Sequence, residues 1–429
     1  MSTTAETIRL QPAKLSGTVK AIPSKSDAHR KLICAALADG ETRLTLGTDA
    51  PGQDILATIA CLRALGADLR EETPGTWLIT PIPAQPPSDP ILDCRESGST
   101  LRFLLPVAGM LANRGVNAAF IGSGRLPERP LEPLIRALKE RGLQFSAEKL
   151  PFRLSGTLTS GRFTLPGDIS SQFISGLLFA LPLLAGSSQI ELTSPLESAA
   201  YADMTIAALS AFGIQIEKSA DGFNCLGSQR LTPPDHLNTE GDWSSAAFFL
   251  AAGALGAEVS VSGLSLTSLQ PDRAVVEHLK QFGAAVKTAP DLVSFAPQPL
   301  HGIKIDASEA PDLVPILAIT ACAAQGETLI YNAARLRIKE SDRLAAMQNC
   351  IRALGGSCEL TEDGMRIYGH GSLTGGTVDS VNDHRIAMAA AIASIICTKP
   401  VFIHGFRAVE KSYPSFFSDF NALGGNAHV

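Results

Sequence analysis

The apolar and polar positions of this chain follow one pattern six times. In each copy an apolar helical stretch ends at a glycine, and a short apolar strand follows. The glycines are Gly66, Gly142, Gly213, Gly283, Gly355 and Gly424. They recur about every 70 residues, and self-similarity at a fixed distance is typical of repeated folding units. Glycine lacks the Cβ that would clash just past a last helical turn, so we predict left-handed C-caps at all six positions.

A second marker keeps the same rhythm. A short polar patch precedes an apolar helix and then a strand rich in β-branched residues. The patches centre on Ser26, Ser99, Ser171, Ser245, Asp312 and Asp383. One small polar residue before a helix is ordinarily only an N-cap. Six in phase with the glycines predict six repeated α/β units, each with two helices and several short strands.

Two breaks in this rhythm, near residues 20–23 and 239–241, predict the domain boundaries. We expect an N-terminal domain of three repeats at residues 22–238, and a C-terminal domain of three repeats at residues 1–21 plus 239–429. If the strand expected at residues 7–10 joins the C-terminal repeats, the chain crosses between the domains twice. A hinged cleft between the domains follows as a hypothesis. The proline-rich residues 81–90 are expected to form an exposed loop.

Composition limits the classes of partner. Hydrophobic residues make up 45% of the chain, charged residues only 18%, and the net charge is -6. This balance argues against nucleic acid or an anionic membrane as a partner, so any basic site must be local. Eight scattered cysteines without metal spacing are interpreted as reduced thiols. No secretory signal is recognised, and the longest apolar runs fall short of the roughly 18 residues of a membrane span, so we expect a cytoplasmic protein.

Three polar patches in the N-terminal half offer anion contacts at helix starts. Residues 23–30 combine two hydroxyls with Lys25 and Arg30, and helix N-termini attract anions. Residues 97–102 add Gly98, which permits close backbone approach, and Arg102. Residues 168–172 offer two hydroxyls and an amide. The alternative for each patch is an ordinary cap with solvated charges.

Charged patches elsewhere have their own alternatives. Residues 125–130 place two guanidiniums on a proline-stiffened loop suited to carboxylate or phosphate, or simply form a surface ion pair between Arg125 and Glu128. The run at residues 337–343 is unusually dense for a charge-poor chain, which favours function. Asp312 begins an apolar helix as either a cap or a partly desolvated base, and His384 could be a capping residue.

Other chemistries fit the sequence poorly. We find no P-loop, no convincing dinucleotide fingerprint, no evident metal set and no serine triad that can be singled out. Acid–base chemistry between phosphorylated or carboxylated small molecules remains.

Eight motifs, in this order and spacing, resemble the 5-enolpyruvylshikimate-3-phosphate synthase family. They are SKSDAHR, SGSTLR, GSGRLPERP, SSQ, the Asp312 patch, RIKESDR, NDHR and the Lys411 segment. The resemblance implies a two-domain inside-out α/β barrel of six repeated α/β units, with the active site in the interdomain cleft. It implies transfer of the enolpyruvyl group of phosphoenolpyruvate to the 5-hydroxyl of shikimate 3-phosphate, without metal or organic cofactor. We expect a monomer.

The resemblance also implies roles for individual residues. Asp312 corresponds to the proton acceptor and Glu340 to the proton donor, while Lys25 assists phosphate departure. Shikimate 3-phosphate would contact Lys25, Ser26, Arg30, Ser170, Ser171, Gln172, Ser198, Tyr201, Asp312 and Lys339. Phosphoenolpyruvate would contact Lys25, Gly98, Arg125, Gln172, Arg343, Arg385 and Lys411, with Arg102 nearby and His384 adjoining. A carboxylic acid that donates at neutral pH needs its pKa raised by burial, whereas neighbouring cations lower it.

Two positions depart from the family pattern, since Glu96 and Arg335 each replace an asparagine. An acidic Glu96 beside an anion pocket is unfavourable unless it turns away or pairs with a cation, such as Arg95 or Arg125. Three other functions are alternatives. The sister transferase that uses UDP-N-acetylglucosamine carries a cysteine loop and an asparagine that this chain lacks. A binding protein without turnover is disfavoured by the presence of Asp312, Glu340 and Lys25 together. Recognition of RNA ends conflicts with the acidic balance.

Overall fold

The structure is a computed structural model and describes residues 6–429. The chain divides into two compact units. The N-terminal unit comprises residues 25–49 and 53–239. The C-terminal unit comprises residues 6–24, 50–52 and 240–429. Each unit has its own cluster of buried hydrophobic residues, so each has its own core.

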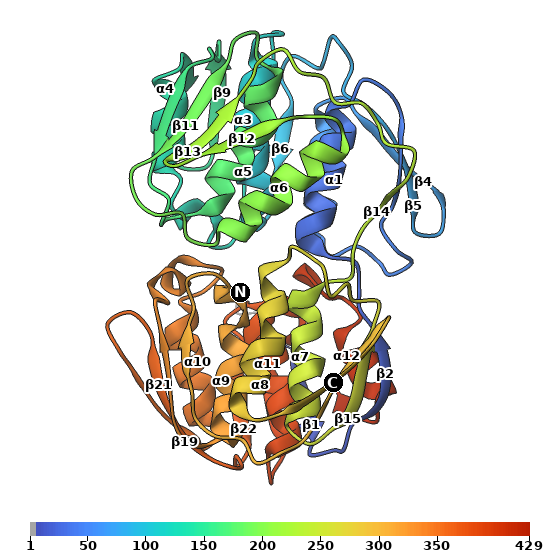
Figure 1. Ribbon diagram of the computed structural model, residues 1–429, viewed down its shortest axis with the longest axis vertical. Helices are drawn as coiled ribbons and strands as arrows, with labels where there is room; N and C mark the ends of the chain where they lie inside the picture. Colours follow the sequence, from blue (N-terminus) through green and yellow to red (C-terminus); the bar gives the residue numbers. More distant parts are fainter. Residues whose placement is uncertain (1–5) are drawn as a thin grey trace. The chain divides into compact units, whose positions relative to one another are not determined.

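Six long stretches of apolar sequence form the central helices of the repeats. They are α1 (Lys25–Leu37), α3 (Gly98–Ala112), α5 (Ser171–Ala180), α7 (Trp243–Ala254), α9 (Val314–Ala323) and α11 (His384–Ala393). All ten residues of α11 are buried, as expected for a helix that is apolar on every side. In the C-terminal unit α7, α9 and α11 pack against one another in the middle, with strands along the outside (Figure 1). In the N-terminal unit α3 packs against α5.

A second helix follows in each repeat. These helices are α2 (Gln53–Ala64), α4 (Glu132–Lys139), α6 (Ala199–Ala211), α8 (Val275–Phe282), α10 (Arg343–Ala353) and α12 (Phe416–Ala422). Each ends close to one of the six repeated glycines. The φ angles of these glycines are +100° at Gly66 and Gly142, +84° at Gly213, +110° at Gly283, +86° at Gly355 and +95° at Gly424. The predicted left-handed C-caps are therefore confirmed.

The described residues form six four-stranded sheets, three in each unit. Every sheet has one parallel strand pair and two antiparallel pairs. In the N-terminal unit the orders are β14 (Leu237–Asn238), β3 (Thr42–Thr45), β5 (Thr76–Thr80), β4 (Asp68–Thr73); β6 (Ile91–Asp93), β7 (Ala119–Ile121), β9 (Phe152–Gly156), β8 (Leu143–Phe145); and β10 (Arg162–Leu165), β11 (Ser188–Leu192), β13 (Gly222–Cys225), β12 (Ile216–Ser219).

In the C-terminal unit the orders are β16 (Ala285–Ala289), β17 (Leu292–Ala296), β15 (Glu258–Ser262), β2 (Ser16–Lys20); β18 (Lys304–Asp306), β19 (Gln325–Tyr331), β21 (Met365–His370), β20 (Ser357–Leu360); and β22 (Gly376–Asp379), β23 (Val401–His404), β1 (Thr7–Gln11), β24 (Asn426–His428). Strand β1 is an inner strand of the last sheet, between β23 and β24. Strand β2 pairs with β15, and β14 pairs with β3, so the first and fourth repeats exchange their first strands.

The predicted fold class, an inside-out α/β barrel of six repeated units with three per domain, is confirmed by this architecture. The eight cysteines are buried and form no disulfide in the described chain. In residues 6–429 no helix is long and apolar enough to cross a membrane. The same residues contain no cluster of three or more histidine, cysteine, aspartate or glutamate side chains arranged to hold a metal ion.

Candidate active site

Many of the candidate residues lie at the starts of the central helices. This placement follows from the repeat, because each polar patch directly precedes or opens an apolar helix. The first turn of a helix carries backbone N–H groups without intrahelical partners and the positive end of the dipole. Each unit therefore presents several anion-attracting helix starts at one end of its core.

In the C-terminal unit, Arg343 is the centre of a buried charge cluster. It is the first residue of α10, and its side chain is only 1% exposed. Nη1 lies 2.7 Å from Oδ1 of Asp312, Nη2 lies 2.5 Å from Oε2 of Glu340, and Nε lies 2.8 Å from Oδ2 of Asp383. Burial favours the neutral form, but the three carboxylates outweigh it and raise the pKa of Arg343 above its usual value.

Asp312 lies in the short 3-10 turn that leads into α9, where it contacts a second arginine. Nη2 of Arg385 lies 2.9 Å from Oδ2 of Asp312, and Nη1 of Arg385 donates to the backbone oxygen of Asp312 at 3.1 Å. Burial alone would raise the pKa of Asp312. Arg385, Lys339 and Arg343 outweigh that effect and hold the pKa below the usual aspartate range. Asp312 is therefore a carboxylate at neutral pH.

The remaining candidates of the C-terminal unit border this cluster. Nζ of Lys339 lies 3.9 Å from Oδ1 of Asp312, and burial lowers the pKa of Lys339 to about 8 although Asp312 opposes the shift. The buried Lys411 donates to the backbone oxygen of Asn382 at 2.6 Å. His384 is 2% exposed and is the first residue of α11, but the N-cap of this helix is Asp383, so His384 is not the capping residue that the sequence left open. The structure thus brings together Asp312, Lys339, Glu340, Arg343 and Arg385.

In the N-terminal unit, Lys25 begins α1 and forms an ion pair with α2. Its Nζ lies 2.9 Å from Oδ2 of Asp54, and the two side chains are 17% and 14% exposed. A hydrogen bond also links α2 to α3, since Oγ1 of Thr58 lies 2.7 Å from Oγ1 of Thr100. The starts of α1, α2 and α3 are therefore held together.

Arg30 lies one turn further along α1 and is 2% exposed. Its Nη1 donates to the backbone oxygen of Ser26 at 2.6 Å, and its Nη2 donates to that of Tyr201 at 2.8 Å. Its Nε donates to Oγ1 of Thr205 at 2.9 Å. Burial lowers the pKa of Arg30 to about 10, which leaves it cationic at neutral pH. Arg30 therefore connects the Ser26 patch with the segment that carries Tyr201.

Gln172 joins the starts of α5 and α3. Its Oε1 accepts from Nη1 of Arg102 at 2.8 Å, and its Nε2 donates to Oγ of Ser99 at 2.9 Å. Oγ of Ser170 accepts from the Gln172 backbone N–H at 3.4 Å as the N-cap of α5. A Cβ added at Gly98 would lie 2.8 Å from Nη1 of Arg102. A larger residue at position 98 would therefore displace the Arg102 guanidinium.

Three other predicted residues occupy separate places. Ser171, next to the cap, is buried in the first turn of α5. Ser198 is 2% exposed and precedes α6 with a left-handed backbone, at φ +55°. Arg125 is 42% exposed, and its Nε lies 3.5 Å from Oε2 of Glu128, which is the surface ion pair that the sequence left open.

The two departures from the family pattern have defined surroundings. A Cβ added at Gly124 would lie 2.6 Å from Oε2 of Glu96, so this carboxylate rests against the loop that leads into Arg125. Nη2 of Arg335 donates to the backbone oxygen of Ser308 at 2.5 Å. Both side chains therefore contact loops that are distant from them in the sequence.

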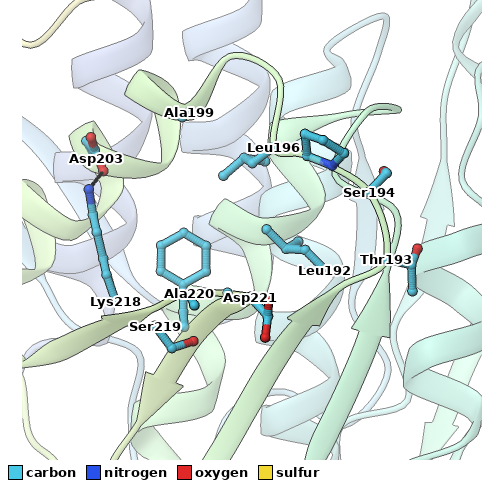
Figure 2. Close-up of a pocket in the computed structure, with 13 residues that line it drawn as sticks. Leu192, Thr193, Ser194, Leu196, Ala199, Asp203, Lys218, Ser219, Ala220 and Asp221 are labelled. Carbon is cyan, nitrogen blue, oxygen red and sulfur yellow. Dashed lines mark ion pairs between the residues drawn. The ribbon is translucent and has the colours of Figure 1, made fainter.

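Two pockets of the N-terminal unit lie away from this chemistry. One, of about 590 Å³, lies between the loop that follows β11 and the β12–β13 hairpin, beside the ion pair of Lys218 and Asp203 at 2.5 Å (Figure 2). The other, of about 690 Å³, contains Arg114 and Arg230 near the end of α1. None of the candidate residues lines either pocket.

Sequence reasoning missed two carboxylates that position the candidate cations. Asp54 holds Lys25, and the fully buried Asp383 holds Arg343. Asp383 was recognised only as the centre of a polar patch, and its position before an apolar helix was the available signal. Nothing in the local sequence around Asp54 points to Lys25.

Comparisons with known proteins agree on one family. A model described as EPSP synthase (3-phosphoshikimate 1-carboxyvinyltransferase) matches residues 10–420. A 3-phosphoshikimate 1-carboxyvinyltransferase of Clostridium acetobutylicum is 44% identical over 429 residues, covering 98% of both chains. One of Clostridium novyi is 42% identical over 431 residues, with the same coverage.

Solved structures give the same result. An EPSP synthase from Acinetobacter baumannii has a TM-score of 0.81 and 28% identity, covering 99% of this chain and 100% of that one. The enolpyruvyl transferase NikO from Streptomyces tendae has a TM-score of 0.76 at 17% identity, covering 98% of each chain. At that identity the NikO comparison supports the fold alone.

Proposed function

The chain belongs to the EPSP synthase family, and on that premise we propose which of its residues carry out the family's reaction. The chain is a transferase of the shikimate pathway. It transfers the enolpyruvyl group of phosphoenolpyruvate to the 5-hydroxyl of shikimate 3-phosphate and releases phosphate. The reaction needs a base near the attacking hydroxyl, an acid near the methylene carbon, and cations around the anionic groups of the substrates.

The charge cluster around Arg343 is the observation that supports these roles. Asp312 is proposed to accept the proton of the 5-hydroxyl, because its carboxylate is ionised and partly exposed, at 22%. A carboxylate bonded to two arginines is a weak base. When substrate anions take over the contacts of Arg343 and Arg385, the pKa of Asp312 will rise, so substrate binding itself strengthens the base.

Substrate binding should also change the contacts of Glu340, the proposed proton donor. Its Oε2 lies 2.5 Å from Nη2 of Arg343, an ion pair that favours the ionised carboxylate. Phosphoenolpyruvate bound to Arg343 would weaken that pair and bring negative charge beside Glu340. Both changes favour the protonated form of Glu340 that can donate to the methylene carbon.

The following residues are proposed to bind the two substrates. For shikimate 3-phosphate the set is Lys25, Ser26, Arg30, Ser170, Ser171, Gln172, Ser198, Tyr201, Asp312 and Lys339. For phosphoenolpyruvate it is Lys25, Gly98, Arg125, Gln172, Arg343, Arg385 and Lys411. Lys25 is proposed to contact both and to assist phosphate departure, since an ammonium stabilises charge that develops on a leaving phosphate. Helix starts and buried cations suit both phosphates.

The compartment and the assembly are also proposals. Eight cysteines without a disulfide in the described chain support a reducing compartment such as the cytoplasm. We propose that the enzyme acts there as a monomer, which size-exclusion chromatography with light scattering will test. A dimer mass at micromolar concentration would contradict this part alone.

Phosphate release from phosphoenolpyruvate tests the function directly. With shikimate 3-phosphate as acceptor we expect stoichiometric phosphate and one enolpyruvyl ether product. With UDP-N-acetylglucosamine as acceptor we expect none. Absence of release with shikimate 3-phosphate would reject the function, and release with the nucleotide sugar alone would assign the chain to the sister activity.

A further inference from the structure

We propose that Asp383 is a positioning residue for phosphoenolpyruvate binding, which it controls by fixing the orientation of the Arg343 guanidinium. This inference rests on the proposed function, in which Arg343 and Arg385 bind that substrate. Asp383 itself is fully buried, with 0% of its side chain exposed, so it reaches the substrate only through the groups that it holds.

The contacts of Asp383 join two segments that are far apart in the sequence. Its Oδ1 accepts from the Arg385 backbone N–H at 3.0 Å and so caps α11. Its Oδ2 accepts from Nε of Arg343 at 2.8 Å and from Oγ of Ser341 at 2.9 Å. One carboxylate thus fixes the start of the helix that carries Arg385 and the side chain of Arg343 at the same time.

The geometry of the guanidinium explains why this contact sets an orientation. Arginine presents its five N–H groups in one plane, along a side edge formed by Nε and one Nη, and an end edge formed by both Nη atoms. Asp383 occupies the side edge, at 2.8 Å from Nε and 3.4 Å from Nη2. The end edge then faces Asp312, at 2.7 Å, and Glu340, at 2.5 Å. A bidentate anchor on one edge leaves the guanidinium little freedom to rotate.

Capping alone does not account for an aspartate at this position. Asparagine is as good an N-cap as aspartate, and the cap needs only one oxygen acceptor. A negative charge beside two anion-binding arginines also opposes the binding of an anionic substrate. Simple electrostatics therefore predicts that removal of this charge tightens phosphoenolpyruvate binding, whereas positioning through Arg343 predicts weaker binding. The sign of the effect distinguishes the two.

The central variant is Asp383→Asn, which keeps the shape and the capping oxygen but removes the charge that holds Arg343. We expect the KM for phosphoenolpyruvate to rise about tenfold or more and the KM for shikimate 3-phosphate to change much less. Asp383→Ala should raise the phosphoenolpyruvate KM to a similar degree but lower the thermal midpoint further, because it also removes the cap.

A matched control is Asp342→Asn. Asp342 caps α10 by accepting from the Ala345 N–H at 3.1 Å, but it is 39% exposed and pairs with Arg337 instead. We expect this control to keep wild-type KM values.

A milder variant keeps the test valid if Asp383→Asn does not fold. Ser341→Ala removes one donor to Asp383 and leaves the carboxylate in place. It should raise the phosphoenolpyruvate KM by a smaller factor in the same direction. Wild-type or lowered phosphoenolpyruvate KM in Asp383→Asn, or an unchanged value in Ser341→Ala when only that variant folds, would overturn the proposal. These outcomes are separate from failure of the proposed function, which would appear as a wild-type protein that releases no phosphate with shikimate 3-phosphate.

Discussion

The ammonium group of Lys339 lies 3.9 Å from Oδ1 of Asp312, and burial lowers the pKa of this lysine to about 8 even beside that carboxylate. Below pH 8 Lys339 is charged and can bind the anionic acceptor substrate. Above pH 8 it loses its proton, so we expect the KM for shikimate 3-phosphate to rise by up to about tenfold per pH unit. Initial rates between pH 6.5 and 9.5 measure this.

Lys339→Arg provides the control for that pH profile. Arginine stays protonated throughout the range, so the rise in KM above pH 8 should disappear even if affinity is lower overall. A profile with the same rise in Lys339→Arg would assign the titration to another group. The pH dependence of folding stability should be opposite in sign to that of substrate affinity. Stability should rise with pH in the range where affinity falls. The pKa of Lys339 in the folded protein lies below the ordinary lysine value of 10.5, so the unfolded chain binds more protons between the two values and stability rises with pH there.

Substitution of Gly98 should weaken the binding of phosphoenolpyruvate more than that of shikimate 3-phosphate. A Cβ at this position would lie 2.7 Å from Nη1 of Arg129 and 2.8 Å from Nη1 of Arg102, so both guanidiniums must shift. Arg102 would then lose its 2.8 Å contact with Gln172. We expect Gly98→Ala to raise the phosphoenolpyruvate KM about tenfold and to change the KM for shikimate 3-phosphate less. Steady-state kinetics with each substrate varied will show the difference.

Gly40→Ala is the control for the Gly98 variant. The added methyl group would lie 3.4 Å from Cγ of Pro233, an ordinary contact, and the backbone of Gly40 is outside the left-handed region. It should leave both KM values unchanged. Equal effects of Gly98→Ala on the two substrates would contradict a specific role beside phosphoenolpyruvate.

The repeated glycines predict a graded loss of stability. At Gly213 the backbone is left-handed, at φ +84°, and an added Cβ would meet nothing within 4 Å, so alanine costs only backbone strain of about 1 kcal/mol. At Gly142, at φ +100°, the Cβ would also lie 2.4 Å from the backbone oxygen of Thr157, so the cost should be larger. Urea unfolding measures both variants. Equal stability losses would show that the clash at Gly142 is relieved by movement of the backbone.

The sequence predicts the repeat architecture well because the markers are local. A glycine after a helix and a polar patch before one each depend on a few neighbouring residues, and both recur in the structure. The exchange of β2 and β14 between the first and fourth repeats is different. Strand β14 has only two residues, and its pairing with β3 depends on where the chain returns after almost 200 residues. No local pattern encodes that pairing.

In the candidate site, too, some features follow from the local sequence and others depend on tertiary packing. Helix starts at Ser26, Ser171 and Asp383 follow from the local pattern. The ion pair of Arg343 with Asp383 and the hydrogen bonds of Arg30 to Ser26 and Tyr201 depend on tertiary packing. In the sequence Arg30 is one more cation at a helix start. In the structure it is almost fully buried between helices, and residue spacing alone does not give its burial or its partners.

The role of Asp312 as proton acceptor is the central claim about mechanism. Asp312→Asn keeps the size of the side chain but cannot accept the hydroxyl proton. It also removes a negative charge from beside Arg343 and Arg385, so substrate anions should bind no less tightly. The turnover rate should fall by about 100-fold or more, a typical loss for a general base.

The most direct measurement is the single-turnover rate of enolpyruvyl transfer in Asp312→Asn, together with the dissociation constant of shikimate 3-phosphate measured by calorimetry. The account predicts a rate at least about 100-fold below wild type with a dissociation constant equal to or lower than that of wild type. A wild-type rate, or a loss of activity explained by weaker substrate binding, would contradict it.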